Sequence, residues 1–326
     1  MPMPARVYAP TPANLRRLAA ALRRGDLVAI PTETVYGLAA HALDAKACRA
    51  IFRAKRRPAN DPLIVHVLDL AQAEDLAVFN PAARRLARRF WPGPLTLVLP
   101  KKRGVPGIVT SGGPTVAIRA PAHPLARRLL RLAKIPLAAP SANLFGYISP
   151  TTAAHVRAGL GARIPHILNG GACAVGVEST VLDMTEPKRP RVLRPGVVTA
   201  AQLRQFLGVK VHGAKSRHPR TRQLAPGMLE RHYSPRTPLV LRSPEAQPPA
   251  GVATVRLRKP GPTPTQHVFW LSRHGALTEI ARNLYGVLRQ VDAGGYRQIW
   301  VEPLPVEAGG LAAAINDRLR RAAAKR

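Results

Sequence analysis

Apolar runs alternate with amphipathic segments along most of the chain, and each run ends at a proline, a glycine or a polar cluster. Short apolar runs predict strands at residues 27–30, 62–67, 95–99, 115–119, 135–139, 175–184 and 191–193. Apolar residues at helical spacing predict helices at 12–22, 44–57, 81–90, 124–133 and 200–207, and another that begins at 149. This alternation of strands and helices indicates an α/β fold.

The pattern changes between residues 208 and 235, where basic and polar residues show no periodicity. Beyond this stretch, strands are predicted at 238–242, 252–257, 267–271 and 298–302, and helices at 277–292 and 311–324. A chain of 326 residues is long enough for two cores, because single cores rarely grow beyond about 300 residues. We therefore expect a larger domain at 1–207, a basic linker at 208–235 and a smaller α/β domain at 236–326.

The chain is strongly basic, with 50 lysines and arginines against 17 acidic residues and a formal net charge of +33. Such a balance favours an anionic partner or substrate. Pairs such as Arg84-Arg85 and Arg88-Arg89 also fit another explanation, in which arginine covers the solvent-facing sides of helices. The charge alone therefore does not identify a function.

Several classes of site are not supported by the sequence. Cys48 and Cys173 are its only cysteines, and they cannot build a disulfide framework or a cysteine-rich metal site. The sequence has neither an apolar run of about 18 residues, as a membrane helix needs, nor a secretory signal, so we expect a cytoplasmic protein. It also lacks the phosphate-loop, dinucleotide, zinc-protease and nucleophile-elbow motifs.

Polar side chains recur where the predicted strands end. They lie in segments 32–34, 55–57, 141–143 and 178–180, and at His66, Thr115 and Arg119. Open α/β sheets build ligand sites where such segments converge. Each also has a structural explanation, because cations complement the dipole at a helix C-terminus and a histidine ending an apolar strand often belongs to the core. The order and spacing of these segments along the chain decide between a ligand site and separate structural roles.

Seven short segments follow one another along the chain: 31–38 (PTETVYGL), 54–58 (AKRRP), 62–66 (PLIVH), 91–96 (WPGPLT), 139–143 (APSAN), 176–180 (GVEST) and 193–196 (LRPG). In this order they closely resemble the YrdC-type threonylcarbamoyl-AMP synthase family. Segments 226–228, 232–235, 283–288, 302–305 and 314–319 resemble the family's long form, which carries an accessory C-terminal domain. The resemblance implies a YrdC-type twisted mixed sheet flanked by helices, followed by a smaller, Rossmann-like α/β domain.

The same resemblance implies a nucleotidyltransferase. The family makes L-threonylcarbamoyl-adenylate from L-threonine, bicarbonate and ATP and releases pyrophosphate. The product serves the tRNA threonylcarbamoyl transferase machinery, which modifies an adenosine beside the anticodon. Mg²⁺ is expected to enter with ATP, held by phosphate oxygens and water, so no metal ligand from the protein is expected. The basic surface could contact tRNA or another RNA, and no membrane partner is expected.

Site residues follow from the resemblance, position by position. Lys55 and Arg57 are expected to hold the triphosphate and to be the catalytic residues. The other expected ATP contacts are Asp61, Thr115, Asn143, Ser149, Arg194 and Tyr233, and Tyr233 would reach over the site from the linker like a lid. The expected threonine contacts are Thr34, His66, Arg119, Ser141 and Ser179, with Arg119 as the partner of the substrate carboxylate. Gly37 is expected to let the chain turn after Thr34.

The chain departs from the family pattern at a few positions. Asn60-Asp61 stands where Asp-Asn is usual, so an acid is expected where the family has an amide. Phe145 and Tyr147-Ile148 change the loop that leads to Ser149, and Ala225 replaces a serine.

Two other functions are compatible with parts of the sequence. An RNA-binding module without catalysis suits the charge of +33, and it predicts salt-sensitive RNA binding that survives Lys55→Ala. The enzyme instead predicts that Lys55→Ala abolishes activity with little loss of fold. Carbamoyl transfer in hydrogenase maturation uses a related domain, but it needs cysteine-rich zinc fingers that two cysteines cannot supply.

Overall fold

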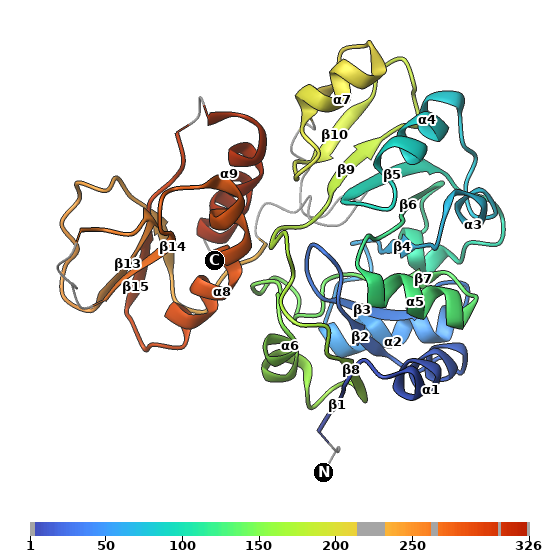
Figure 1. The fold of residues 1–326 in the computed structure, drawn as a ribbon, viewed down its shortest axis with the longest axis horizontal. Helices are drawn as coiled ribbons and strands as arrows, with labels where there is room; N and C mark the ends of the chain where they lie inside the picture. The colour runs from blue at the N-terminus through green and yellow to red at the C-terminus, as the bar shows by residue number, and fades with distance from the viewer. Residues whose placement is uncertain (1–3, 214–231, 262–266, 306–307, 325–326) are drawn as a thin grey trace.

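The computed structural model describes residues 4–213, 232–261, 267–305 and 308–324, which form a larger and a smaller α/β unit (Figure 1). The larger unit contains β1 (Arg6–Tyr8), α1 (Pro12–Arg23), β2 (Val28–Ile30), β3 (Gly37–His41), α2 (Ala45–Lys55), β4 (Ile64–His66), α3 (Leu70–Glu74), α4 (Pro81–Phe90), β5 (Leu95–Pro100), η1 (Gly107–Thr110), β6 (Thr115–Arg119), α5 (Pro124–Ala133), β7 (Leu137–Ala138), α6 (Ala153–Leu160), β8 (His166–Leu168), β9 (Thr180–Asp183), β10 (Arg191–Arg194), α7 (Ala200–Leu207) and β11 (His212–Gly213). The smaller unit contains β12 (Leu239–Leu241), β13 (Val252–Arg258), β14 (Val268–Ser272), α8 (Leu277–Asp292), β15 (Gln298–Val301) and α9 (Gly310–Ala323).

Each unit is built on its own sheet. Within the described residues, the larger sheet has 11 strands in the order β1-β8-β2-β3-β7-β4-β6-β5-β9-β10-β11. It is mixed, because β2 and β3 are antiparallel whereas β4 and β6 are parallel, with His66 opposite Arg119. The smaller sheet has the order β12-β15-β13-β14 and is parallel throughout. The twisted mixed sheet and the separate small α/β unit confirm the predicted fold class.

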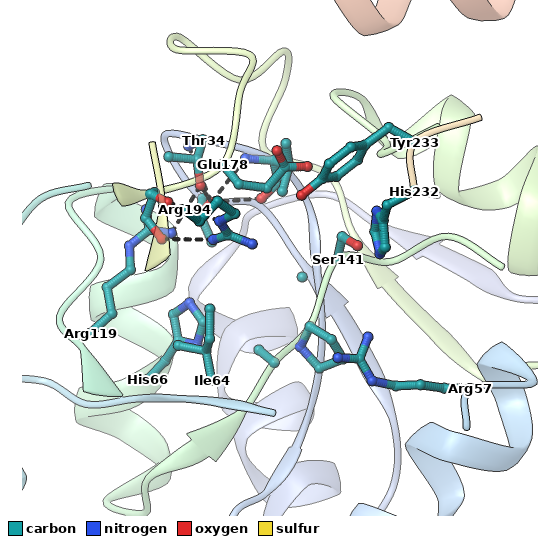
Figure 2. Close-up of a pocket in the computed structure, with 16 residues that line it drawn as sticks. Thr34, Arg57, Ile64, His66, Arg119, Ser141, Glu178, Arg194, His232 and Tyr233 are labelled. Atoms are coloured by element: carbon teal, nitrogen blue, oxygen red, sulfur yellow. Dashed lines mark hydrogen bonds between the residues drawn. The ribbon is translucent and has the colours of Figure 1, made fainter. Parts of the chain in front are cut away.

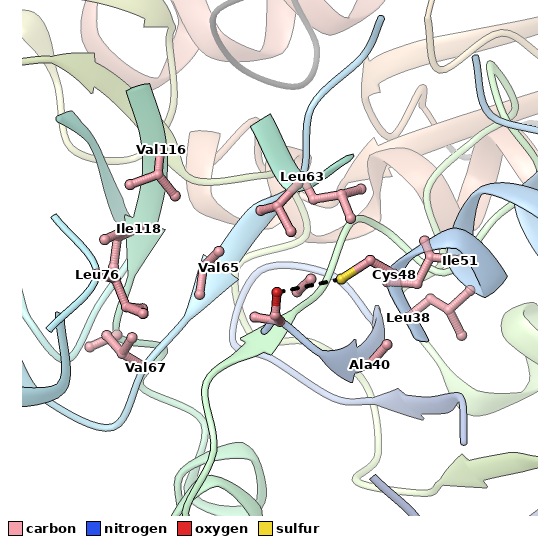
Figure 3. Packing of buried hydrophobic residues seen from close by; sticks show 14 of the residues in the cluster. Leu38, Ala40, Cys48, Ile51, Leu63, Val65, Val67, Leu76, Val116 and Ile118 are labelled. Atoms are coloured by element: carbon pink, nitrogen blue, oxygen red, sulfur yellow. Dashed lines mark hydrogen bonds between the residues drawn. The ribbon is translucent and has the colours of Figure 1, made fainter. Parts of the chain in front are cut away.

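Helices cover both faces of the larger sheet because neighbouring strand residues point to opposite sides. Leu38 of β3 packs with Ile51 of α2 and Val65 of β4 on one face (Figure 3). Ala39, the next residue along β3, packs on the other face with Leu129 of α5 and Leu18 of α1. The helix starts follow capping chemistry, as at α2, where the side chain of Asp44 accepts from the backbone of Lys46 and Ala47.

Some predicted elements differ from the structure. β3 pairs with β2 immediately after loop 31–36, whereas the sequence predicts no strand between residues 30 and 44. Its residues are buried but small, so they give neither an alternating pattern nor a strong apolar run. β1, β8 and α3 were also missed. α6 begins after its cap, Thr152, rather than at 149.

The predicted strand at 175–184 is wrong in its first half, because only Thr180–Asp183 forms β9. Gly176 has a φ of +84°, and a Cβ placed there would lie 2.3 Å from the carbonyl oxygen of Ala281 in α8. The first half of the segment is therefore a loop that passes close against the smaller unit.

α8 and α9 face the larger unit, with the small sheet on their far side (Figure 1). An apolar cluster crosses this interface, joining Val35, Ile148 and Val177 of the larger unit to Leu284 and Ile315 of the two helices. The large sheet continues to Gly213, past the expected boundary at 207, because β11 pairs with β10. Most of the expected linker, including Ala225 and segment 226–228, lies outside the described residues. None of the described helices has the length and apolar character that crossing a bilayer demands.

Candidate active site

A pocket lies where the ends of several strands of the larger sheet meet (Figure 2). Its wall is made by residues next to strands β2, β3, β4, β6, β7, β9 and β10, together with Arg57 after α2 and two residues just before the smaller unit. The lining residues are Thr32, Thr34, Val35, Gly37, Arg57, Ile64, His66, Arg119, Ala139, Pro140, Ser141, Glu178, Ser179, Arg194, His232 and Tyr233. The fold thus brings together polar segments that are far apart in the sequence.

The loop between β2 and β3 is held by its threonines. The hydroxyl of Thr32 donates to the carbonyl of Val35 at 2.6 Å and accepts from the backbone N–H of Thr34 and Val35, both at 3.2 Å. Because its hydrogen is used there, Thr34 is the donor in the 2.9 Å contact between the two threonine hydroxyls. The lone pairs of Thr34 are then directed to other donors.

One such donor is Arg119, whose guanidinium is fixed by three groups. It donates to the hydroxyl of Thr34 at 3.0 Å and to the carbonyl of Gly93 at 3.2 Å, and it forms an ion pair with Glu33 at 2.7 Å. Although burial opposes ionisation, Arg119 holds the pKa of the Glu33 carboxyl below its ordinary value. The arginine expected to bind the carboxylate of threonine is thus already oriented by a carboxylate of the protein.

Gly37 has a different role from the one expected. It is the first residue of β3, where it pairs with Ile30, and its backbone is not in the left-handed region. A Cβ there would lie 3.2 Å from the Cβ of Ala139. The glycine therefore lets β3 approach the segment that carries Ser141, with which it forms an isolated β-bridge, and it does not make a turn.

Lys55 and Arg57 lie in a dense buried charge cluster. The ammonium of Lys55 donates to the carbonyls of Ser141 at 2.5 Å and Asn143 at 2.6 Å, and its side chain is only 1% exposed. Arg57 pairs with Asp61 at 2.9 Å and donates to the carbonyls of Asp61 and Pro62. Burial, followed by the charge of Arg57, lowers the pKa of Lys55 well below its ordinary value.

Asp61, the acid that replaces an expected amide, therefore has a structural partner. Burial raises the pKa of its carboxyl, while Arg57 and Lys55 act in the opposite direction. It is fully buried behind Arg57 and does not belong to the lining of the pocket described above. Its effect on a bound nucleotide would act through Arg57.

Arg194 and Ser179 form a second polar group on the wall. Arg194 donates to the carbonyl of Ser179 at 3.1 Å and to its hydroxyl at 3.2 Å. The same hydroxyl lies 2.8 Å from the hydroxyl of Thr96 in β5. Ser179 is thus held from two sides, and both residues are buried.

His66 is a neutral group in the pocket. Burial, and then the charge of Arg119, lower the pKa of His66 to about 3. Its Nδ1 atom is buried and has no hydrogen-bond partner among the described residues. His66 can therefore offer a neutral hydrogen bond to a ligand, but it is a poor general base at neutral pH.

His232 and Tyr233 close one side of the pocket (Figure 2). Tyr233 is 1% exposed and has a left-handed backbone with φ of 63°, which is uncommon for an aromatic residue. The hydroxyl of Tyr233 and Nδ1 of His232 are buried without a hydrogen-bond partner in the described parts of the chain. The expectation that Tyr233 reaches the site is thus consistent with its position on the wall.

Glu178 is a lining residue for which sequence analysis predicted no role. Its carboxylate accepts from the hydroxyl of Ser149 at 2.6 Å, from Tyr285 of α8 at 2.9 Å and from Arg318 of α9 at 2.9 Å. The family resemblance covers segment 176–180, but it led only to Ser179. Local sequence could not reveal this contact, because both helical partners are more than 100 positions away in the chain.

Eight of the expected residues line the pocket: Thr34, Arg57, His66, Arg119, Ser141, Ser179, Arg194 and Tyr233. Lys55, Asp61, Asn143 and Ser149 lie behind the wall, each bonded to a lining residue or, for Asn143, to Lys55. Thr115 begins β6, at the opposite end of the strand from Arg119, and is not among the lining residues. Sequence analysis gave no role to His232 or to Thr32, although both lie in segments that carry the resemblance.

The acidic side chains around the pocket form ion pairs with arginines. Glu33 pairs with Arg119, Asp61 with Arg57, and Glu178 with Arg318. Within the described ranges, His, Cys, Asp and Glu side chains nowhere gather in a group of three or more that could hold a metal ion.

Comparison with known proteins agrees with this description. The Sua5/YciO/YrdC family, described as "Telomere recombination", matches residues 20–196, and the "Threonylcarbamoyl-AMP synthase, C-terminal domain" family matches 198–324. Relatives named threonylcarbamoyl-AMP synthase include proteins of Pyrococcus abyssi and Bacillus subtilis, each 42% identical over 96% of this chain and over 95% and 94% of their own length. The crystal structure of P. abyssi Sua5 complexed with L-threonine superposes with a TM-score of 0.88, at 39% identity, over 98% of both chains.

The fold and the pocket thus define a two-domain protein of the Sua5/YciO/YrdC class. The chain belongs to the threonylcarbamoyl-AMP synthase family.

Proposed function

We propose that this chain is a nucleotidyltransferase that makes L-threonylcarbamoyl-adenylate from L-threonine, bicarbonate and Mg-ATP, releasing pyrophosphate. The main support is a pocket lined by Arg57, Arg119 and Arg194 beside several hydroxyls, in a chain similar over nearly its full length to a Sua5 solved with L-threonine. Relatives from two organisms carry the name threonylcarbamoyl-AMP synthase. The product would serve tRNA modification through a separate transferase.

The reaction needs two bond-forming steps. The amine of threonine attacks the carbon of bicarbonate, and hydroxide leaves with a proton as water, which gives a carbamate. A carbamate oxygen then attacks the α-phosphorus of ATP, and the bond to the bridging oxygen breaks to release pyrophosphate. Positioning of the reactants can supply about 7 to 11 kcal/mol of the barrier. The remaining demand is neutralisation of phosphate charge, which buried arginines can meet.

On the threonine side, we propose that Arg119 binds the substrate carboxylate while Glu33 and Thr34 hold its guanidinium in place. Thr34, Ser141 and Ser179 offer hydroxyls around the same space, and His66 offers a neutral ring nitrogen. A site that bonds the hydroxyl of threonine rejects analogues without it more strongly than an apolar pocket would.

On the nucleotide side, we propose that Arg57 and Arg194 contact the phosphates, with Thr115, Asn143 and Tyr233 completing the contacts. The buried Oδ1 atom of Asn143 has no hydrogen-bond partner in the described residues, which supports a role toward a ligand. Lys55, Asp61 and Ser149 would act through the residues to which they are bonded. Each charge-assisted contact to a phosphate contributes about 1.5 to 3 kcal/mol.

Mg²⁺ would enter as part of the nucleotide. The pocket carboxylates already pair with arginines, so the ion would be held by phosphate oxygens and water, as is usual for magnesium. This arrangement predicts that chelation abolishes activity without unfolding the protein.

The direct test is pyrophosphate release from Mg-ATP by the purified protein, with threonine and bicarbonate omitted in turn. We expect release only when both are present. Release that ignores either omission would overturn the assignment. RNA binding without threonine-dependent release would favour the alternative of a non-catalytic RNA-binding module.

A further inference from the structure

The carboxylate of Glu178 lies at the boundary between the two units. It lines the pocket and is 5% exposed, yet two of its partners belong to α8 and α9 of the smaller unit. Tyr285 donates to its Oε2 atom at 2.9 Å, and Arg318 forms an ion pair with the same atom at 2.9 Å. Helices of the smaller unit therefore reach the wall of the pocket in the larger one.

Arg318 is deeply buried, with 1% of the residue exposed. Besides Glu178, it donates to the carbonyl of Pro195 at 2.7 Å and pairs with Asp317 at 3.0 Å. Its guanidinium carbon lies 5.4 Å from the centre of the Tyr233 ring. Tyr233 also stacks on Tyr285, with ring centres 5.8 Å apart and an angle of 26° between the planes.

The charge of Arg318 matters because the proposed ligands are anions. Glu178 is the acidic residue among the lining side chains, and it shares the wall with Arg57, Arg119 and Arg194. Although burial opposes ionisation, Arg318 and then Arg194 hold the pKa of Glu178 below its ordinary value. An ionised Glu178 without Arg318 would draw Arg194 away from a ligand and would repel phosphate.

We propose that Arg318 is a positioning residue of the active site, through which the smaller unit neutralises Glu178 and seats Tyr233 against the pocket. This inference rests on the proposed function, because it assumes that ATP is the anion to be bound. The smaller unit thus neutralises an acidic side chain of a pocket that the larger unit builds, and it supports one wall of that pocket.

The test compares Arg318→Gln with the double variant Glu178→Gln/Arg318→Gln, in full-length protein. Arg320→Gln is the matched control, since Arg320 is exposed on the same helix. KM for ATP and kcat are measured from pyrophosphate release, and the dissociation constant of a non-hydrolysable ATP analogue is measured by calorimetry. Circular dichroism establishes that each variant is folded.

We expect Arg318→Gln to raise the KM for ATP about tenfold or more while kcat falls less than about threefold, because an unpaired buried charge opposes binding of an anion more than the chemical step. The double variant should recover most of the loss, and Arg320→Gln should match the wild type. If Arg318→Gln does not fold, a double variant that folds and binds the analogue supports the same conclusion.

An unchanged KM in Arg318→Gln, or a double variant as impaired as the single one, would overturn the inference. These results are distinct from failure of the proposed function. In that case the wild-type protein itself would show no release that depends on threonine and bicarbonate.

Discussion

Lys55 is an expected site residue whose buried position indicates a structural role. The family resemblance predicts a triphosphate contact for Lys55, whereas its position at the C-terminal end of a helix also fits a structural role. In the structure its ammonium holds the carbonyls of Ser141 and Asn143, which shape the wall of the pocket. We therefore infer that Lys55 supports the site through these backbone groups.

Lys55→Met should consequently lose stability as well as activity, which revises the sequence-based expectation of little loss of fold. Two buried carbonyls lose a charged donor, and the expected decrease in the free energy of unfolding is about 2 kcal/mol or more. Thermal unfolding and pyrophosphate release measure the two effects. Lys46→Met, at an exposed position of the same helix, is the control. A Lys55→Met protein of wild-type stability would show that these contacts contribute little.

The lowered pKa of His66 predicts that the protein loses stability in acid. The folded protein holds the pKa of His66 at about 3, whereas the unfolded chain binds a proton near the ordinary value of 6.5. The contribution of His66 to the free energy of unfolding is therefore fully present above pH 6.5. It is lost as the pH falls below 6.5, by about 1.4 kcal/mol per pH unit.

His66→Gln should weaken this dependence. Between pH 7.5 and 5.0, we expect the variant to lose about 2 kcal/mol less unfolding free energy than the wild type, as measured by urea denaturation. His274→Gln, which changes an exposed histidine, is the control. Equal pH dependence in His66→Gln and the wild type would contradict a buried neutral His66.

At the scale of elements, the loop at 145–149 explains a departure from the family pattern. The hydroxyl of Tyr147 donates to Asp292 of α8 at 2.7 Å, and its ring lies under the guanidinium groups of Arg289 and Arg236. Ile148 is fully buried in the apolar cluster between the units. The unusual pair Tyr147-Ile148 therefore ties the loop that leads to Ser149 to the smaller unit.

Tyr147→Phe keeps the ring and removes this hydrogen bond. We expect it to lower the free energy of unfolding by about 1 to 2 kcal/mol, because the acceptor is a carboxylate. Differential scanning calorimetry provides the measurement. Tyr296→Phe, which removes an exposed contact to His267, should have a smaller effect. Equal effects of the two substitutions would argue against a stabilising role for the Tyr147 contact.

Elements with a strong local signal could be predicted from the sequence. α8 has the bounds that its periodicity predicts, and α7 has its predicted bounds and begins with a capping box at Thr199. β3 could not be predicted, since its small buried residues form a strand only through pairing with β2 and β7. Tertiary pairing, rather than local preference, decides such a segment.

The same division applies to the site. Arg119 ends a predicted strand and Thr34 lies shortly after one, so the convergence of strand ends could be anticipated. Their partners could not be, because Glu33 turns toward Arg119, and Glu178 toward Arg318, only in the folded chain. Electrostatic pairing depends on distances in space that a pattern along the sequence does not contain.

At the scale of the molecule, a chain with a formal charge of +33 contains a pocket whose own carboxylates pair with arginines. The pocket can thus attract anions and still hold its arginines in fixed positions. Contact of the basic surface with tRNA stays a prediction. The smaller unit packs against the rear of the pocket and supplies Arg318 and Tyr285, so both units take part in one site.

The central claim is that one pocket joins threonine, bicarbonate and ATP. The most direct measurement is mass spectrometry of the product formed from ¹³C-bicarbonate, L-threonine and Mg-ATP. We predict L-threonylcarbamoyl-adenylate carrying the heavy carbon, formed by the wild type and strongly reduced in Arg57→Gln. Formation of AMP or ADP without a labelled threonine adduct would contradict the account.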